Sequence, residues 1–315
     1  MKTIFLKHPY NPAQIGNQPV VLALGFFDGL HLGHQEVIRK AKEISQEQGL
    51  DLAVLTFNHT PKLIYQKIHP WHYTYLTILD RKQELMAALG VDILYVAEFT
   101  WDLGHLLPQE FVDSYIVGLK AQAVVAGFDY TYGPKEIANM QTLIQHSQGR
   151  FSVTEISEKR LHQHKIGATS IRDYLEKGLM QEANRELGYI YQTSGLVING
   201  LKRGRTIGYP TANVALDHGQ VIPGIGVYVV EFWVQGHWYQ GMASIGYNIT
   251  FNDVSDLSVE VYILDFDRMI YGEAVKINWH HYLRPEAKFD GIPALIDQLD
   301  ADRLATQEYF AVLNK

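Results

Sequence analysis

The 315-residue sequence is 47% apolar and 19% charged, a balance typical of folded globular proteins. Its formal net charge of −7, without a long run of lysine or arginine, argues against nucleic acid and an anionic membrane as partners. Cysteine is absent, which excludes disulfides, zinc-thiolate sites and a cysteine nucleophile. The first residues, MKTIFLKHPYNPAQ, lack the apolar core of a secretory signal, so we expect a cytoplasmic protein.

The first half of the chain alternates short apolar runs with segments that carry apolar residues at helical spacing. The apolar runs predict buried parallel strands, and each helical segment ends at a glycine or opens with a proline. Strand–helix alternation of this kind predicts a doubly wound α/β domain. The predicted strands are Val20–Gly25, Leu52–Phe57, Ile93–Ala97 and Ala123–Gly127, and the predicted helices are His34–Gln48, Arg81–Leu89 and Pro108–Leu119.

A glycine- and histidine-rich segment, GFFDGLHLGH at residues 25–34, links the first predicted strand to the first predicted helix. In a doubly wound sheet, ligands bind at this carboxyl end of a strand. Its glycines let the backbone approach a phosphate chain, and His31, His34 and the helix N-terminus can donate hydrogen bonds to phosphate oxygens. The arrangement suits nucleotidyl transfer, in which an incoming phosphate attacks the α-phosphate of ATP. His-x-Gly-His alone is equally consistent with two histidines beside an ordinary turn.

The pattern changes around Tyr189–Thr193, where short runs rich in valine, isoleucine and tyrosine begin to follow one another between glycine turns. Closely spaced short strands predict a compact antiparallel β-barrel. Residues 291–313 predict one or two closing helices, and a boundary at Glu186 gives domains 1–185 and 186–315. The predicted barrel strands are Gly195–Ile198, Val227–Trp233, Tyr239–Ile245, Val259–Phe266 and Ala274–Trp279.

A second candidate site lies in KRGRTIGYPTANV at residues 202–214. Gly204 and Gly208 bracket a basic stretch that ends in Pro-Thr-Ala-Asn. The Thr211 hydroxyl and the Asn213 amide are hard oxygen ligands of the type that Mg²⁺ accepts beside ATP phosphates. The Gly-Lys-Ser/Thr ending of a Walker loop is absent. Taken alone, Pro-Thr-Ala-Asn is equally typical of a turn with an Asx hydrogen bond.

Phosphoryl transfer to a hydroxyl group also needs a base, and Glu260 is a candidate. This carboxylate lies between Val259 and Val261 in the strand-like run LSVEVYILDF. A lone carboxylate in an apolar strand is also what alternation toward solvent produces, so that reading stays open beside the catalytic one.

With both sites in view, the chain resembles the bacterial bifunctional riboflavin kinase/FAD synthetase family over nearly its whole length. The resemblance rests on Gly-x-Phe-Asp-Gly-x-His-x-Gly-His in the first half and Gly-Arg-Thr-x-Gly-Tyr-Pro-Thr-Ala-Asn in the second. It implies a nucleotidyltransferase-like, Rossmann-like domain followed by a kinase barrel. Further motifs follow in the family's order at Thr56-Phe57, Gly127–Gly133, Thr169–Arg172, Gly226–Tyr228, Ser244–Gly246 and Tyr271-Gly272.

For the first domain, the resemblance implies an FMN adenylyltransferase site that binds ATP and a flavin. His31 and His34 would contact the ATP phosphates as catalytic residues. The residues implied in ATP binding are Gly25, Phe27, Asp28, Gly33, Thr169 and Arg172, and those implied near the flavin are Phe57, Phe128 and Asp129.

For the second domain, the resemblance implies a riboflavin kinase site. It places the catalytic carboxylate at Glu260, which would accept the proton of the ribityl hydroxyl group. Arg284 would contact the flavin or a phosphate, and a surface ion pair with Glu286 is the alternative. The residues implied in ATP binding are Gly204, Gly208, Thr211 and Asn213, of which the last two would also bind Mg²⁺.

The chain departs from the family pattern at three places. Gly167-Ala168 stands where the family usually has serines ahead of Thr169, Asn58–Pro61 stands where it is usually richer in proline, and Ile249 stands where it commonly has proline. Loss of a hydroxyl–phosphate hydrogen bond weakens binding by roughly ten- to a hundredfold. The first domain is therefore the half whose activity the departures call into question.

The expected function is phosphorylation of riboflavin to FMN and adenylylation of FMN to FAD, with ATP as co-substrate. A riboflavin kinase with a degenerate first domain is one alternative. A flavin-binding regulator is a second, but it would need neither set of phosphate-handling residues. A nucleotidyltransferase for pantetheine phosphate, glycerol phosphate or nicotinate mononucleotide is a third, and it leaves the second domain unexplained.

Overall fold

The structure, a computed structural model, describes residues 1–69, 73–161, 164–200, 204–247 and 257–313. Contacts between residues divide the chain into two units, Met1–Ala168 and Thr169–Lys315, which are described separately below. The division by contacts falls earlier in the chain than the predicted domain boundary at Glu186. The departure at Ile249 lies outside the described residues.

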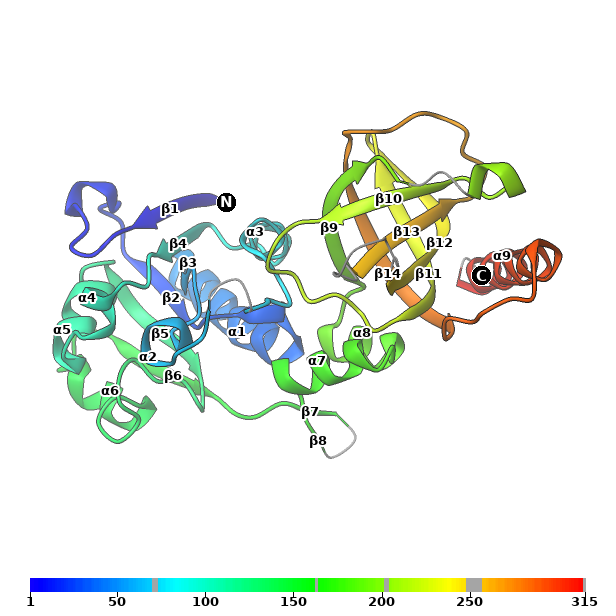
Figure 1. The fold of residues 1–315 in the computed structure, drawn as a ribbon. Coiled ribbons are helices and arrows are strands. Elements are labelled where there is room, and N and C mark those ends of the chain that lie inside the picture. The colour runs from blue at the N-terminus through cyan, green and yellow to red at the C-terminus, as the bar shows by residue number, and fades with distance from the viewer. Residues whose placement is uncertain (70–72, 162–163, 201–203, 248–256, 314–315) are drawn as a thin grey trace. The chain divides into compact units, whose positions relative to one another are not determined.

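The first unit is built on a six-stranded sheet whose order is β1-β4-β3-β2-β5-β6 (Figure 1). Every neighbouring pair of strands is parallel, as the strand–helix alternation predicts. The four predicted strands are confirmed, and two strands at the edges of the sheet, β1 and β6, add to them. The strands are β1 (Lys2–Leu6), β2 (Val20–Leu24), β3 (Asp51–Phe57), β4 (Ile93–Ala97), β5 (Ala121–Gly127) and β6 (Ser152–Ile156), and β7 (Arg160–Leu161) pairs separately with β8 (His164–Lys165).

Two apolar cores lie on the two faces of this sheet. One gathers Val37, Ile38 and Met86 from α1 and α3 against the sheet. The other gathers Phe111 and Leu143 from α5 and α6. Helices on both faces make this a doubly wound domain. Its helices are η1 (Pro12–Gln14), η2 (Asp28–Leu30), α1 (Leu32–Gln48), α2 (Lys62–Tyr65), α3 (Leu79–Ala88), α4 (Trp101–Gly104), α5 (Pro108–Val112), η4 (Asp113–Val117) and α6 (Met140–Ser147).

The predicted single helix over Pro108–Leu119 is divided in the structure. After α5 the chain continues as the π-helical turn η4. The Tyr10 hydroxyl donates to the Ser114 carbonyl, and the Gly118 amide donates to the Asp113 carbonyl at 2.9 Å. A side chain inserted at a backbone carbonyl is a known cause of such a widened turn.

The second unit contains a closed six-stranded barrel in the order β10-β13-β12-β11-β14-β9. All its neighbouring strands are antiparallel, which confirms the predicted barrel. Alternate residues fill the interior, where the Trp279 indole donates to Thr193 Oγ1 at 2.9 Å. The strands are β9 (Tyr191–Ile198), β10 (Thr211–Leu216), β11 (Gly226–Val234), β12 (His237–Tyr247), β13 (Leu257–Ile263) and β14 (Ala274–Arg284).

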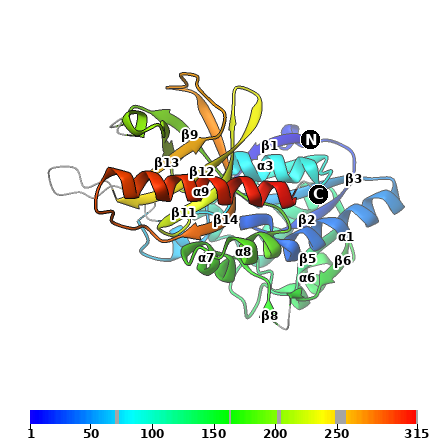
Figure 2. The same cartoon turned by 90° about the vertical axis from the view of Figure 1, so that its right-hand side faces the viewer.

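Helices cover the outside of the barrel. α8 (Met180–Leu187) packs against β9 and β14, so the whole helix belongs to the second unit although most of it precedes the predicted boundary at Glu186. α9 (Ile292–Leu313) is one continuous helix that runs alongside β12, as Figure 2 shows. The unit also contains α7 (Ala168–Glu176) and the short 3-10 helix η5 (Gly204–Ile207).

Candidate active sites

The first candidate site lies where the strand order of the parallel sheet reverses. β2 pairs with β3 on one side and with β5 on the other, so the carboxyl ends of these three strands adjoin. The segment 25–34 leaves β2 at this point, between Phe57 at the end of β3 and Gly127 at the end of β5. Open α/β sheets bind their ligands at such switch points.

The backbone of this segment is tightly turned. Phe27 and Leu30 have left-handed φ angles of 55° and 38°, and Gly29 has a φ of 74°. Non-glycine residues in this region cost about 1–3 kcal/mol each, so the surrounding structure must hold them there. Phe27 folds back over Gly25, where a Cβ atom would lie 2.8 Å from its ring. Phe27 and Asp28 are both buried, so their side chains help to shape the loop.

His31 caps the N-terminus of α1. Its Nδ1 accepts a hydrogen bond from the His34 amide at 3.3 Å, and Gly33 leaves room for the ring. Because Nδ1 is the acceptor, the proton of the neutral ring is on Nε2, where it is available to a phosphate oxygen. The sequence singled out His31 as a phosphate ligand, and the capping bond adds a reason for its orientation.

His34 stacks on His31, with ring centroids 3.7 Å apart, and meets the edge of Phe27. Its Nδ1 is buried without a hydrogen-bond partner in the described part of the chain. Burial lowers the pKa of His31 to about 4. Burial also lowers the pKa of His34 well below its usual value, and electrostatic repulsion by His31 and Lys82 lowers the pKa of His34 further. Both rings are therefore neutral hydrogen-bonding groups near neutral pH.

The predicted flavin-side residues of the first domain lie in different surroundings. Phe57 packs against Phe99, with ring centroids 5.0 Å apart, and belongs to the apolar core. Phe128 and Asp129 are exposed just beyond β5. Lys165 of β8 lies over the Phe128 ring at 4.7 Å and pairs with Asp129 at 3.0 Å. Sequence reasoning missed Lys165, because a lysine in a short hairpin carries no signal of this contact.

Thr169 and Arg172 lie on α7, at the beginning of the second unit. Their grouping with His31 and His34 stays a prediction. α7 begins at Ala168, so the backbone N–H groups of its first turn have no partners within the helix.

The second candidate site lies on the outer face of the barrel. Asn213 of β10 is directly opposite Glu260 of β13, and Glu260 is opposite Ser244 of β12. Thr211 lies two residues from Asn213 on the same face, and its Oγ1 donates to Glu260 Oε2 at 3.0 Å. The structure therefore brings together three residues that the sequence placed in one site. It adds Ser244, which shares their face.

The row of opposed residues continues through Val227 to Arg284 on β14. Neighbouring strands are about 4.8 Å apart, so the backbones of Arg284 and Glu260 are three strand spacings apart, roughly 14 Å measured around the curved wall of the barrel. The Arg284 guanidinium group binds the buried carboxylate of Asp302 on α9, with an Nη2–Oδ2 distance of 2.7 Å. The surface ion pair with Glu286 is therefore not the arrangement in this structure. A flavin contact of Arg284 stays a prediction.

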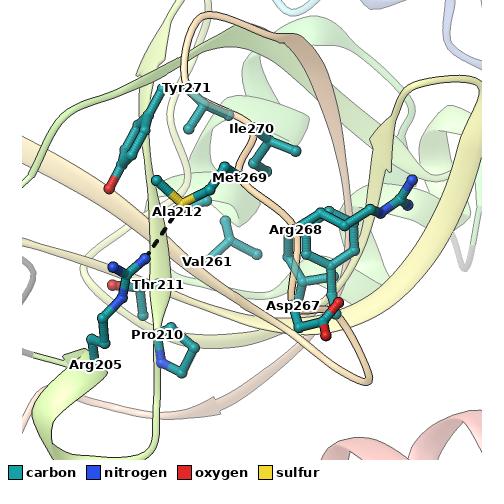
Figure 3. Close-up of a pocket in the computed structure, with 13 residues that line it drawn as sticks. Arg205, Pro210, Thr211, Ala212, Val261, Asp267, Arg268, Met269, Ile270 and Tyr271 are labelled. Atoms are coloured by element: carbon teal, nitrogen blue, oxygen red, sulfur yellow. Dashed lines mark hydrogen bonds between the residues drawn. The ribbon is translucent and has the colours of Figure 1, made fainter.

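A cavity of about 330 Å³ opens at one end of the barrel, beside the row of opposed residues that contains Glu260 (Figure 3). Thr211 lines this cavity and also contacts Glu260, so the cavity and the row meet at this residue. Charged side chains and apolar side chains both contribute to its wall. The lining residues are Val197, Arg205, Pro210, Thr211, Ala212, Val261, Ile263, Phe266, Asp267, Arg268, Met269, Ile270 and Tyr271.

The two glycines predicted in ATP binding shape the turn that leads into this cavity. A Cβ atom on Gly204 would lie 2.1 Å from the Tyr209 carbonyl oxygen, and Gly208 has a φ of 85°. Between them, Arg205 extends toward Met269, with an Nη2–Sδ distance of 3.5 Å (Figure 3). Arg205 was not selected from the sequence, although it belongs to the same motif.

Oxygen ligands near Glu260 suit a magnesium ion. The Thr211 hydroxyl, the Asn213 amide and the Glu260 carboxylate supply hard donors on one face, and Mg²⁺ commonly takes only one or two protein ligands beside ATP phosphates. Among the described residues, no group of three or more histidine, cysteine or acidic side chains forms a self-contained metal site. The residues therefore fit an ion that is shared with a nucleotide.

Two family models together match most of the chain. The model for FAD synthetase matches residues 13–170, and the model for riboflavin kinase matches residues 187–310. The second match begins close to the predicted domain boundary. An FAD synthetase domain on the parallel sheet and a riboflavin kinase domain on the barrel agree with the architecture expected from the sequence.

Relatives match over the full length. The bifunctional riboflavin kinase/FMN adenylyltransferase of Listeria monocytogenes is 50% identical over 313 residues, which is 99% of each chain. The protein of the same name from Bacillus subtilis is 41% identical over 318 residues, which is 100% of each chain. A crystal structure described as a macrolide-efflux protein from Streptococcus pneumoniae superposes with a TM-score of 0.90 at 36% identity, covering 98% of this chain and 99% of that one.

The described part of this chain contains no helix that is long and apolar enough to cross a membrane. The family resemblance predicted from the motifs is confirmed by both domain matches and by the two bifunctional relatives. The chain belongs to the bifunctional riboflavin kinase/FMN adenylyltransferase family.

Proposed function

We propose that the protein forms FMN from riboflavin and ATP in its barrel domain, and FAD from FMN and ATP in its α/β domain. The observation that carries the proposal is the meeting of Thr211, Asn213 and Glu260 on one face of the barrel, beside a cavity. The names of the bifunctional relatives support both reactions. ATP is abundant in the cytoplasm, which is where we propose that the enzyme acts.

In the kinase reaction, we assign the cavity to ATP and Glu260 to the role of base. A nucleotide in the cavity would reach Thr211, beyond which Glu260 can accept the proton of the ribityl hydroxyl group. Thr211 and Asn213 would hold Mg²⁺, which when bound would neutralise charge on the phosphates. Arg205 and Arg268 add positive charge to the cavity wall.

In the adenylyl transfer, we assign His31 and His34 to the ATP phosphates. The Nε2–H of His31 and the N-terminal end of α1, where backbone N–H groups gather, suit an anion. Lys165 and the exposed Phe128 ring offer a charged and an aromatic surface to FMN. Thr169 and Arg172 would complete the phosphate contacts.

The second candidate function is riboflavin phosphorylation alone, and the observation that favours it is Gly167-Ala168. Backbone N–H groups at the start of α7 can replace part of what serine hydroxyls would supply. We therefore expect the adenylyl transfer to be retained.

One assay separates these possibilities. The purified protein is incubated with Mg²⁺ and ATP, together with riboflavin in one tube and FMN in another, and the flavins are separated by chromatography. FAD in both tubes supports the bifunctional proposal. FMN from riboflavin without FAD in either tube supports the kinase alone. The absence of both products contradicts the proposal.

Substitutions at the two sites should separate the two reactions. We expect Glu260→Gln to lower FMN formation by about a hundredfold or more, because the base is lost, and to leave FAD formation from supplied FMN unchanged. Replacing His31 and His34 with alanine should lower FAD formation by about tenfold or more and leave FMN formation unchanged. Glu308→Gln, an exposed carboxylate on α9, is the control. If either set of changes stopped both reactions in a folded protein, the two-site assignment would be wrong.

A further inference from the structure

A buried lysine lies beneath the first site, and the proposed roles do not use it. Lys82 of α3 is only 3% exposed. Its Nζ donates to the Phe26 carbonyl at 2.8 Å and to Thr56 Oγ1 at 3.4 Å, and it lies 4.4 Å from the centre of the Phe26 ring. A buried ammonium group that is held by neutral oxygens is costly, so its presence calls for a reason.

The residues just before α3 hold the same loop. Thr77 Oγ1 accepts from the Gly29 amide at 3.0 Å, and the Thr77 amide donates to Asp28 Oδ1 at 3.2 Å. Phe26 and Asp28 are thus tied to one short stretch of chain that ends in Lys82. The left-handed Phe27 lies between these two attachments, and the left-handed Leu30 directly follows the second one.

The charge of Lys82 also acts on the nearby histidines. Its charge lowers the pKa of the buried His34, whose ring stacks on His31. A positive charge in a region of low dielectric acts strongly on nearby anions, because water does not screen it there. Lys82 can therefore favour phosphates at the histidines without touching them.

We infer that Lys82 is a positioning residue for adenylyl transfer: its ammonium group fixes the turn at Phe26–Leu30 and supplies positive charge behind the phosphate site. This inference rests on the proposed function of the first domain. Lys82 acts through the Phe26 carbonyl, Thr56 and the electric field at His34, and is itself shielded from the substrate.

The inference has a consequence for pH. Burial lowers the pKa of Lys82 to about 8, and the negative charge of Asp28 opposes this effect. The titratable groups that face Lys82 are Asp28 on the loop and His34 on α1, with His31 stacked behind the latter. Above about pH 8 the ammonium group loses its proton, so the positive charge disappears while the histidines are already neutral.

The test measures kcat/KM for ATP in FMN adenylylation by the full chain, from about pH 7 to about pH 9.5, because this quantity reports ionisations of the free enzyme. We expect the wild type to lose about tenfold over this range. Lys82→Arg keeps a charge that does not titrate here, so its activity should persist at the upper end. Lys82→Met should be at least tenfold less active near pH 7 and insensitive to pH.

Riboflavin phosphorylation is measured with the same preparations as a control, because it reports how pH affects ATP itself and the activity of the barrel domain. Lys42→Met is the matched control, because Lys42 of α1 also donates to a backbone carbonyl, that of Leu89, at 3.2 Å. It should leave adenylylation unchanged. Thermal unfolding shows whether each variant is folded.

A wild-type profile that is flat to about pH 9.5 would overturn the inference even if a variant failed to fold. So would a Lys82→Arg enzyme that retained the alkaline loss, or a Lys82→Met enzyme within twofold of wild type. If the wild type formed no FAD from FMN at any pH, the proposed function of the first domain would fail, and this inference with it.

Discussion

At the scale of single residues, burial sets the chemistry of the first site. His31 is turned by its capping bond to the His34 amide, and both rings are held neutral by their surroundings. Neutral imidazoles donate to phosphate through one nitrogen without the cost of burying a charge before ATP arrives. The two rings can therefore donate to an anion without themselves carrying a buried charge.

This arrangement makes the stability of the first domain depend on pH. His31 has a pKa of about 4 in the folded chain and 6.5 ordinarily, so the unfolded chain binds more protons between these values. Stability should be fully present above about pH 6.5 and fall as the pH drops toward about 4. His31→Asn keeps a capping acceptor and should reduce this slope.

Calorimetric unfolding at a series of pH values measures the effect. His105→Asn is the control, because His105 is exposed. An unchanged slope in His31→Asn would show that burial of this ring does not control the pH dependence.

Residue types and spacing predicted which groups gather in the kinase site, but not which ion pairs form there. Thr211, Asn213 and Glu260 were selected from the sequence, and strand pairing brings them together. Arg284 was expected to contact a ligand or Glu286, whereas its partner is Asp302 on a helix that follows later in the chain. Lys82 carries no signal at all, because a lysine in a helix ordinarily faces solvent.

At the scale of elements, α9 anchors the kinase motif. The Tyr209 hydroxyl donates to Asp300 of α9, and Arg303 pairs with the same carboxylate at 2.9 Å. Burial and Asp300 raise the pKa of Tyr209 to about 12. Tyr209 immediately precedes Pro210 and Thr211, so one helix fixes the start of β10 and also binds Arg284 through Asp302.

Removing the anchor should loosen the site without removing a catalytic group. We expect Tyr209→Phe to reduce kcat/KM for riboflavin phosphorylation by roughly threefold to tenfold, the effect of one buried hydrogen bond. FMN adenylylation should be unchanged. Steady-state kinetics of both reactions measure this, with Leu304→Ala, an exposed position on α9, as control. Equal losses in both variants would contradict the anchoring role.

The central strands of the sheet could be predicted because their apolar pattern is strong, and the edge strands could not because their apolar pattern is weak. The strand Ile93–Ala97 has the predicted bounds, because it is a continuous apolar run. β1 and β6 are edge strands: β1 mixes exposed and buried residues, and the residues of β6 are exposed or half-buried, which gives no clear apolar pattern. Pro-Thr-Ala-Asn is equally typical of a turn with an Asx hydrogen bond, whereas pairing with β9 and β13 makes Thr211–Leu216 the strand β10.

At the scale of the whole molecule, two units each carry a core and a candidate site. The product of the kinase reaction is the substrate of the adenylyl transfer, and the two sets of residues do not overlap. The predicted domain boundary at Glu186 and the contact-based division after Ala168 differ by the segment that contains α7 and α8. α8 packs on the barrel, so its apolar residues belong to the core of the second unit. The two family matches, which end at residue 170 and begin at residue 187, leave all of α8 but its last residue uncovered.

Independent sites predict complementation between two impaired variants. A mixture of Glu260→Gln protein with protein that lacks His31 and His34 should convert riboflavin to FAD much faster than either variant does alone. FMN made by the second protein must diffuse to the first, so the initial lag should shorten as protein concentration rises. Chromatography of timed samples measures the lag. Failure of the mixture, when each variant retains its other reaction, would indicate that FMN passes only within one molecule.

The outward orientation of Glu260 and Asn213 on a closed barrel has a consequence for engineering. Side chains on strands alternate between the two faces, so the residues that fill the barrel far from its cavity, such as Tyr191 and Trp279, lie on the opposite face of the wall from Asn213 and Glu260. Changes of similar volume there alter heat resistance while the exterior keeps its geometry. Selection for thermal tolerance can thus draw on the interior and leave the exterior side chains of Thr211, Asn213 and Glu260 unchanged.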